Sequence, residues 1–163
     1  MIVMKFGGTS VRDSVAVERL IRIVSENSPR KSVVVVSALS GVTDILTQVA
    51  MHASEGHAED ATMLTARLEE RHLEMTGKLL SGNNALLTEV RETIIQLFAR
   101  LNEMVKVISI LEELSDMSMA KILSYGEILS SSIIHKAMVN YGLKCAFADA
   151  RNFIVTDSRY LKG

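Results

Sequence analysis

The chain has 163 residues, of which 48% are hydrophobic and 23% are charged, a composition typical of a globular domain with its own core. Its formal net charge of −1, with no block of like charges, argues against partners such as nucleic acid or an anionic membrane. With no Trp, three Tyr and four Phe, it also offers few aromatic side chains on which single-stranded bases could stack.

The cysteine content and the N-terminal residues indicate the cellular compartment. The one cysteine, Cys145, cannot form a disulfide within the chain, which suits a reducing compartment. The first four residues run directly into Lys5 and Gly7, so we find no apolar region of a signal peptide. No apolar run approaches the roughly 20 residues that a membrane-spanning helix requires. We therefore expect a soluble, cytoplasmic protein.

The first predicted elements are a strand, a helix and a second strand. Ile2–Phe6 is a short apolar run closed by glycines, which predicts a buried strand. The helix after it has apolar residues at the spacing i, i+3, i+4 and i+7, namely Val17, Leu20, Ile21 and Val24. Thr9 or Ser10 is its expected N-cap, and Pro29 marks the break that follows. The consecutive valines of Ser32–Ser37 predict a strand buried on both faces, so we expect a right-handed βαβ unit.

The middle of the chain is predicted to be helical. A helix begins near Asp44, and residues 53–115 form a polar helical insert with a turn at 82–84 between two long helices. The apolar positions of the insert follow the helical period at Val90, Ile94, Leu97, Leu101, Val105 and Ile108. A further helix covers Met117–Tyr141 and ends at Gly142.

The last residues predict two more strands, Lys144–Asp149 and Phe153–Asp157, with Cys145 buried as a small hydrophobic residue. Only a few residues follow the second of these strands, so little chain remains there to cover the sheet. We therefore expect an α/β fold with a mostly parallel sheet and flanking helices, truncated partway, rather than a complete four-stranded domain.

Glycines follow the first predicted strand, at the edge where open α/β sheets bind ligands. Gly7 and Gly8 have no β-carbon, so backbone N–H groups can approach a phosphate oxygen there, and the next helix directs its positive end at that anion. Lys5 would add a full positive charge. A plain tight turn beside a lysine that extends to solvent explains the same residues equally well. The order of lysine and glycines differs from that of the P-loop, and G-x-G-x-x-G is not matched either.

A second group of polar residues follows the valine-rich strand. Ser37, Ser40 and Thr43 place three hydroxyl groups around Gly41, next to the start of a helix, which suits a carboxylate or a phosphate. The alternative is a glycine turn in which Thr43 caps the helix. The residues around Ser40 do not match the G-x-S-x-G pattern of a hydrolase nucleophile.

A third group lies within the last predicted helix. Gly126 costs about 1 kcal/mol relative to alanine in a helix, so its presence indicates that another element packs closely there. Glu127 could hold a cationic group such as a substrate ammonium, although from these residues alone a structural ion pair is the preferred explanation.

Residue types that bind metals occur together at His52, Glu55, His57 and Asp60. They match neither C-x-x-C nor H-E-x-x-H spacing, and the segment has the composition of a solvated loop. We therefore predict no metal site.

Together, K-F-G-G-T-S-V at the N-terminus, S-A-L-S-G-V-T after the second strand and L-S-Y-G-E in a later helix resemble aspartate kinase, the aspartokinase branch of the amino-acid kinase family. The resemblance covers the whole chain, and the helical insert resembles the one that distinguishes aspartokinases from acetylglutamate and uridylate kinases. It implies that residues 1–163 are the N-terminal portion of one amino-acid kinase domain with a three-layer sandwich fold, without its nucleotide-binding C-terminal half.

The resemblance implies ATP- and Mg²⁺-dependent phosphorylation of the β-carboxylate of L-aspartate, the first step of lysine, threonine and methionine biosynthesis. It gives Lys5 the catalytic role of contacting the β- and γ-phosphates. The implied nucleotide-binding residues are Lys5, Phe6, Gly7, Gly8, Thr9, Ser10 and Ser37. Thr43 would bind aspartate, and Glu127 would bind its α-amino group.

The chain departs from the family pattern in extent. Aspartokinases continue through a second half with a glycine-rich nucleotide segment and an arginine for the substrate carboxylate, and ACT domains or a homoserine dehydrogenase often follow. We expect this chain to be inactive alone and the complete protein to be a homo-oligomer. The alternatives are another amino-acid kinase with a different acceptor, or a non-catalytic protein that binds an amino acid or pairs with a kinase subunit.

Overall fold

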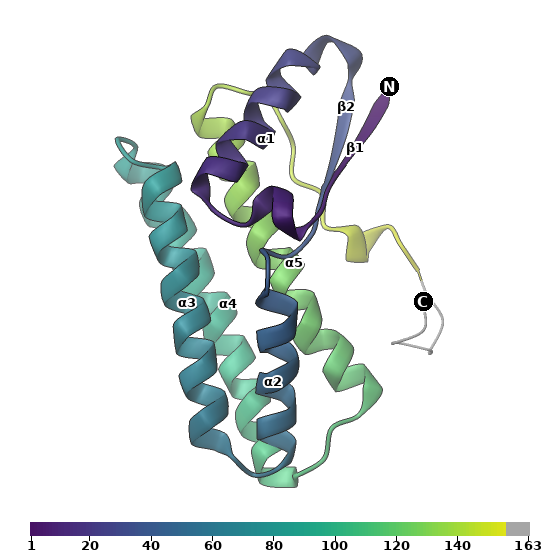
Figure 1. Ribbon diagram of the computed structural model, residues 1–163, viewed down its shortest axis with the longest axis vertical. Coiled ribbons are helices and arrows are strands. Elements are labelled where there is room, and N and C mark those ends of the chain that lie inside the picture. The colour runs from purple at the N-terminus through teal and green to yellow at the C-terminus, as the bar shows by residue number, and fades with distance from the viewer. Residues whose placement is uncertain (156–163) are drawn as a thin grey trace.

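The computed structural model describes residues 1–155, and its first elements form the predicted βαβ unit (Figure 1). Strand β1 (Ile2–Phe6) pairs in parallel with strand β2 (Ser32–Val36), with Ile2 opposite Ser32 and Phe6 opposite Val36. Helix α1 (Ser14–Glu26) connects the two strands. Its apolar stripe is buried as the helical spacing predicts, and a 3₁₀ turn that contains Pro29 separates α1 from β2.

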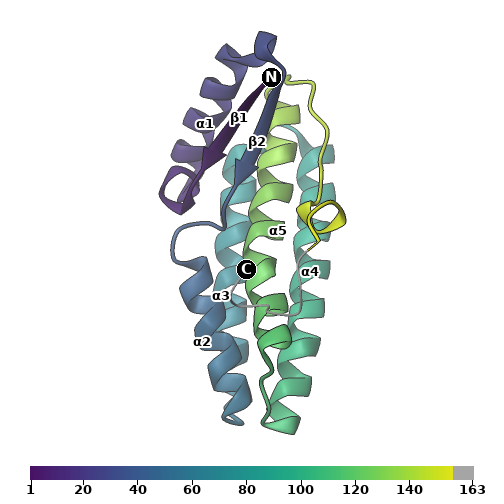
Figure 2. The same cartoon turned by 90° about the vertical axis from the view of Figure 1, so that its right-hand side faces the viewer.

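Four further helices make up most of the molecule, and Figure 2 shows them running alongside one another, with the last of them extending up beside the two strands. Their bounds are α2 (Val42–Ser54), α3 (Ala58–Leu79), α4 (Asn84–Leu111) and α5 (Asp116–Asn140). Helix α2 packs on α3, α4 and α5, and α3 packs on α4. The helices predicted between residues 53 and 115 are found as α3 and α4, and residues 80–83 join them, so Asn84 of the predicted turn at 82–84 already belongs to α4. No helix among residues 1–155 is long and apolar enough to span a membrane.

One continuous hydrophobic core joins the βαβ unit to the helices. Its largest fully buried side chains come from α1, the loop after β2 and all four long helices: Phe98, Leu20, Leu39, Leu46, Leu68, Leu80, Ile94, Leu101, Ile122, Leu129, Ile133 and Ile134. Within the helices these side chains repeat at the helical period, although in α4 Phe98 is buried where Leu97 was predicted, so burial of apolar area accounts for the arrangement of the helices.

The predictions that Ser32–Ser37 is buried on both faces and that Ile2–Phe6 is a buried strand are wrong for the described residues. Val3, Val33 and Val35 are 63%, 47% and 46% exposed, whereas Met4 and Phe6 point the other way and pack against the core. Successive side chains of a strand point to opposite faces, and here the helices cover only one face of the sheet. A valine run therefore identified the strand but not what covers its outer face.

The two strands predicted near the end of the chain are also not found. Lys144–Asp149 has no strand conformation, and neither does 153–155, while Thr156 and Asp157 lie outside the described residues. A strand needs a neighbouring backbone with which to exchange hydrogen bonds, and the described sheet contains only β1 and β2. Cys145 is consequently exposed, and its predicted burial is wrong.

The N-cap of α1 also differs from the prediction. Thr9 and Ser10 lie in a separate 3₁₀ turn (Gly8–Val11), and Asp13 caps α1 by accepting a hydrogen bond from the Ala16 N–H at 2.8 Å. This hydrogen bond lowers the pKa of the Asp13 carboxyl, and the hydrogen bond and positive charge of Arg12 lower it further by a smaller amount. The hydroxyl groups of Thr9 and Ser10 are thus not used to begin the helix.

Candidate active site at the sheet edge

The loop from Ser37 to Gly41, directly after β2, is where the three predicted groups of residues meet. The Ser37 N–H donates to the Phe6 carbonyl at 3.1 Å, which extends the β1–β2 pairing by one bond. A β-carbon on Gly8 would lie 3.3 Å from the Ala38 carbonyl oxygen and 3.5 Å from the Ser40 Cα. The glycine turn after β1 therefore lies directly against this loop.

Helix α5 approaches the same loop through Gly126. A β-carbon on Gly126 would lie 2.8 Å from the Ala38 Cβ, closer than real side chains pack, and 3.4 Å from a Val42 methyl carbon. This confirms the prediction that another element packs closely on that glycine. The cost of a glycine within a helix is thus offset by the close approach of α5 to the loop.

Two side chains of α5 then hold the loop by hydrogen bonds. The Ala38 N–H donates to Glu127 Oε1 at 3.3 Å, and the Ser130 hydroxyl donates to the Ser37 carbonyl at 2.8 Å. Among residues 1–155, Glu127 forms no ion pair, so the structural ion pair that the residues alone favoured is not what holds this side chain. Its carboxylate contacts the backbone of the loop instead.

Lys5 and Gly7 lie at the end of β1 with space beside them. Lys5 is exposed, on the same sheet face as Val3 and Val35. Gly7 has φ −77° and ψ 175°, an extended conformation that any residue adopts, and no atom of the described residues lies within 4 Å of a β-carbon built there. Neither backbone strain nor a described neighbour explains why this position is glycine. An external group that approaches the backbone would explain it.

The N-terminus of α2 lies on the other side of the loop. Gly41 has φ +77°, the left-handed region that favours glycine, and no side chain caps the helix that follows. Thr43 is the second residue of α2 and is exposed, so the alternative in which it caps the helix does not apply. The first N–H groups of α2, together with the positive end of its dipole, suit an anion at this edge.

Sequence reasoning missed Ser130, which supports the site from behind. It is fully buried and lies one helical turn after Gly126, on the same face of α5. That spacing of a small residue and a hydroxyl was the available signal. The Asp149–Arg151 pair, at 2.6 Å, is a local interaction between neighbouring residues, and the hydrogen bond from the Arg151 side chain lowers the pKa of the Asp149 carboxyl.

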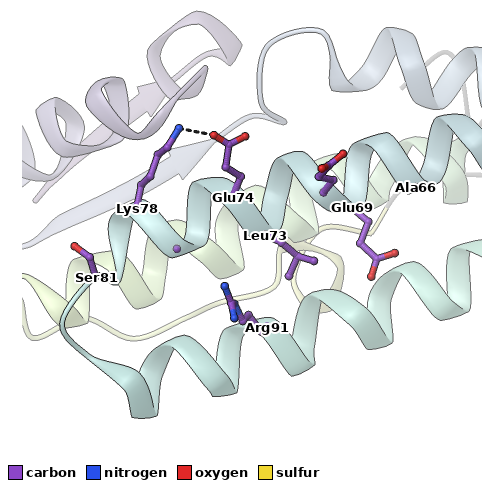
Figure 3. Close-up of a pocket in the computed structure, with 9 residues that line it drawn as sticks. Ala66, Glu69, Leu73, Glu74, Lys78, Ser81 and Arg91 are labelled. Carbon is purple, nitrogen blue, oxygen red and sulfur yellow. Dashed lines mark hydrogen bonds and ion pairs between the residues drawn. The ribbon is translucent and has the colours of Figure 1, made fainter.

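A shallow groove of about 890 Å³ lies elsewhere, between α3 and the start of α4 (Figure 3). Glu69, Glu70, Glu74, Lys78 and Arg91 line it, and Lys78 pairs with Glu74 at 2.6 Å. Burial raises the pKa of Glu69 in this groove. None of the predicted site residues lines it, so the sheet edge remains the candidate active site.

Comparisons with known proteins identify the family of the chain. The model of the amino acid kinase family matches residues 1–162. The chain belongs to the amino acid kinase family. It is 33% identical over 162 residues to an aspartokinase from Chlamydia trachomatis, covering 99% of this chain and 33% of that protein. The chain therefore spans about a third of the length of such a relative.

Solved structures show the same fold. Escherichia coli aspartokinase III in complex with lysine and aspartate (T-state) matches with a TM-score of 0.85 and 23% identity, over 98% of this chain and 34% of that one. The same enzyme in complex with aspartate and ADP (R-state) matches with a TM-score of 0.80, at 23% identity, over 98% of this chain and 33% of that one. The predicted resemblance to aspartokinases is thus confirmed, in a mostly helical chain with a small parallel sheet.

Proposed function

We propose that this chain supplies the phosphate-facing and acceptor-facing part of an aspartate kinase. The observation that carries the proposal is the convergence of three separate sequence groups on the loop from Ser37 to Gly41. Gly8 packs on it from β1, and Gly126 and Glu127 pack on it from α5. The aspartokinase relatives, and an E. coli aspartokinase III structure that holds aspartate and ADP, support the same function.

The nucleotide phosphates would lie at the end of β1. Gly7 leaves its backbone open to approach, and the hydroxyl groups of Thr9 and Ser10 are exposed beside it. The site residues fit a polyphosphate, since they offer unshielded N–H groups, hydroxyl groups and the exposed ammonium of Lys5, with Phe6 and Ser37 forming the adjoining backbone. In this proposal ATP is the phosphoryl donor and its Mg²⁺ supplies charge neutralisation.

The acceptor would lie between the N-terminus of α2 and α5. Thr43 is exposed there, and Glu127 accepts one backbone hydrogen bond at 3.3 Å through Oε1, which leaves Oε2 for a substrate ammonium. The β-carboxylate of aspartate is already ionised at neutral pH, so transfer needs no general base. Lys5 and the N–H groups instead neutralise the charge on the transferring phosphoryl group and orient the two reactants.

The complete protein in this proposal contains more than the described residues. A further portion would carry the adenosine side of the site and would cover the exposed face of β1 and β2, completing the three-layer sandwich. We propose a cytoplasmic, homo-oligomeric enzyme of lysine, threonine and methionine biosynthesis, and a chain of 163 residues that is inactive alone. No other function has an observation of comparable strength.

Trapping of the acyl phosphate tests the proposal. The longest natural product of the gene is incubated with MgATP, hydroxylamine and either L-aspartate or L-glutamate. Hydroxamate from aspartate alone supports the kinase, and hydroxamate from glutamate alone indicates a different acceptor. Lys5→Ala should abolish the product, whereas Lys106→Ala, which removes another exposed lysine on α4, should not. Absence of hydroxamate with both amino acids would favour a non-catalytic binding or subunit-pairing protein.

A further inference from the structure

The end of α2 has a turn that places two histidines against each other. Gly56, at φ +77°, folds the chain back, and the Gly56 N–H donates to the Ala53 carbonyl at 3.1 Å. The His57 N–H donates to the His52 carbonyl at 2.9 Å. These two bonds define a Schellman motif. The two positions that His52 and His57 occupy in this motif commonly hold apolar side chains that contact each other.

The end of α5 shows the same motif with the usual side chains. There the Gly142 N–H donates to the Val139 carbonyl and the Leu143 N–H donates to the Met138 carbonyl, both at 3.0 Å. The contact positions hold Met138, which is buried, and Leu143, which packs against the core. The comparison within one chain shows that the motif closes with an apolar pair. Two imidazoles at the end of α2 are therefore not required by the fold.

A carboxylate completes the group at the end of α2. One ring nitrogen of His52, one of His57 and a carboxylate oxygen of Glu55 all lie within 4.8 Å of one another. The His57 Nδ1 is 3.6 Å from Glu55 Oε2, and the two imidazole centroids are 6.1 Å apart. Nδ1 of His52 is buried and has no hydrogen-bond partner among the described residues. The Glu112 carboxylate lies beside Gly56, 3.2 Å from where a β-carbon would be, and adds negative charge.

We propose that His52, Glu55 and His57 form a binding site for a divalent transition-metal ion of the zinc class. Two imidazole nitrogens and one carboxylate oxygen form a ligand set that Zn²⁺ accepts, with water in the fourth position, whereas Mg²⁺ and Ca²⁺ prefer oxygen ligands alone. Small rotations of the exposed Glu55 and His57 side chains would bring ligand atoms separated by up to 4.8 Å around one ion beside the half-buried His52. For three of the four residues, this proposal departs from the prediction, made from spacing alone, that the segment holds no metal.

The ion would join the end of α2 to the start of α3, at the end of the helices that lies away from the sheet (Figure 1). Helix α2 has 13 residues, so the ion would lie about 20 Å from the loop at Gly41. The site is therefore independent of the proposed kinase chemistry. The bound ion would stabilise the α2–α3 turn, because an ion that binds the folded chain but not the unfolded chain shifts folding toward the native state.

Metal titration of the purified chain, freed of metal with a chelator, tests this proposal. At pH 7.5 we expect one Zn²⁺ per chain by calorimetry, Co²⁺ absorption bands typical of a nitrogen and oxygen site, and a higher melting temperature with Zn²⁺. His57→Ala and Glu55→Gln should each weaken binding about tenfold or more. Both side chains are more than half exposed, so these variants should keep the fold. Absence of binding at 0.1 mM Zn²⁺ would overturn the proposal.

Two further variants separate loss of the ligands from loss of the fold. The double variant His52→Met with His57→Leu copies the apolar pair at the end of α5, and it should lose zinc binding while keeping the helical circular dichroism. A second double variant, His135→Ala with Cys145→Ser, removes a histidine and a cysteine thiol near the C-terminal end of α5. It should bind zinc as the parent does. Retained binding in the first variant, or lost binding in the second, would place the ion elsewhere.

Discussion

The four long helices and the two-stranded sheet are both apolar in sequence, yet only the helices enclose their apolar side chains. Leu101 of α4 and Ile133 of α5 are fully buried between neighbouring helices. In the sheet, Val33 and Val35 alternate with Val34, and only Val34 packs against the core. The difference shows that contacts within the described residues determine the packing of the helices, whereas those contacts leave one face of the sheet uncovered. The two regions should accordingly respond differently to substitution.

The largest effect is expected where the helices pack most tightly. Phe98 is 1% exposed at the centre of α4, and its ring lies 5.7 Å from the His72 ring. Phe98→Ala should lower the free energy of unfolding by roughly 3–5 kcal/mol, because a large cavity forms among side chains that cannot close it. Urea denaturation followed by circular dichroism measures the change. A loss below about 1 kcal/mol would mean that the helices are not closely packed.

Acid should destabilise the same region through His72. Its Nδ1 lies 2.6 Å from the Leu68 carbonyl, which can only accept, so Nδ1 carries the proton and the buried Nε2 has no partner. Burial lowers the pKa of His72 to about 4. Below pH 6.5 the His72 side chain therefore binds a proton in the unfolded chain, whereas in the folded chain it binds that proton only near pH 4. Stability should fall over that interval as pH decreases, by about 3 kcal/mol at most.

His72→Leu isolates this contribution from that of the carboxylates. Denaturation of the parent and the variant at pH 7 and pH 4.5 gives the difference in pH dependence. The variant should lose less stability than the parent between these two values. Equal losses would show that His72 takes up its proton in the folded chain without cost.

The joint between the two regions should show an intermediate effect. Gly126→Ala places a β-carbon 2.8 Å from the Ala38 Cβ, so α5 must move away from the loop, and we expect a loss of roughly 1–3 kcal/mol despite the better helix propensity of alanine. Gly77→Ala is the matched control on α3, since its nearest atom is 3.9 Å away. The control should gain about 0.5–1 kcal/mol. Similar changes in both variants would contradict the close approach.

These contrasts also explain which features could be predicted from the sequence. The helical period located the helices because each buries its own stripe, and Gly126 indicated a close contact because a helix tolerates glycine poorly. Ser130 was missed because its one signal, a position one helical turn after Gly126, does not reveal that its hydroxyl donates to a carbonyl distant in the sequence. Cys145 was placed wrongly, because a short alternating run becomes a strand only where a neighbouring strand pairs with it. The histidines of the α2–α3 turn match no spacing rule, because a backbone motif brings together residues that are five positions apart.

The smallest effect is expected on the uncovered face of the sheet. Val35 is 46% exposed, so Val35→Thr should change the free energy of unfolding of this chain by less than about 0.5 kcal/mol. Val17→Thr, at a position with no exposure, should cost roughly 1–3 kcal/mol because it buries a hydroxyl group. Measured in the longest natural product of the gene, Val35→Thr distinguishes two situations. If the loss of stability rises toward that of Val17→Thr, other residues cover this face. If the loss stays near zero, the face is exposed in the whole protein, and the proposed three-layer sandwich is contradicted.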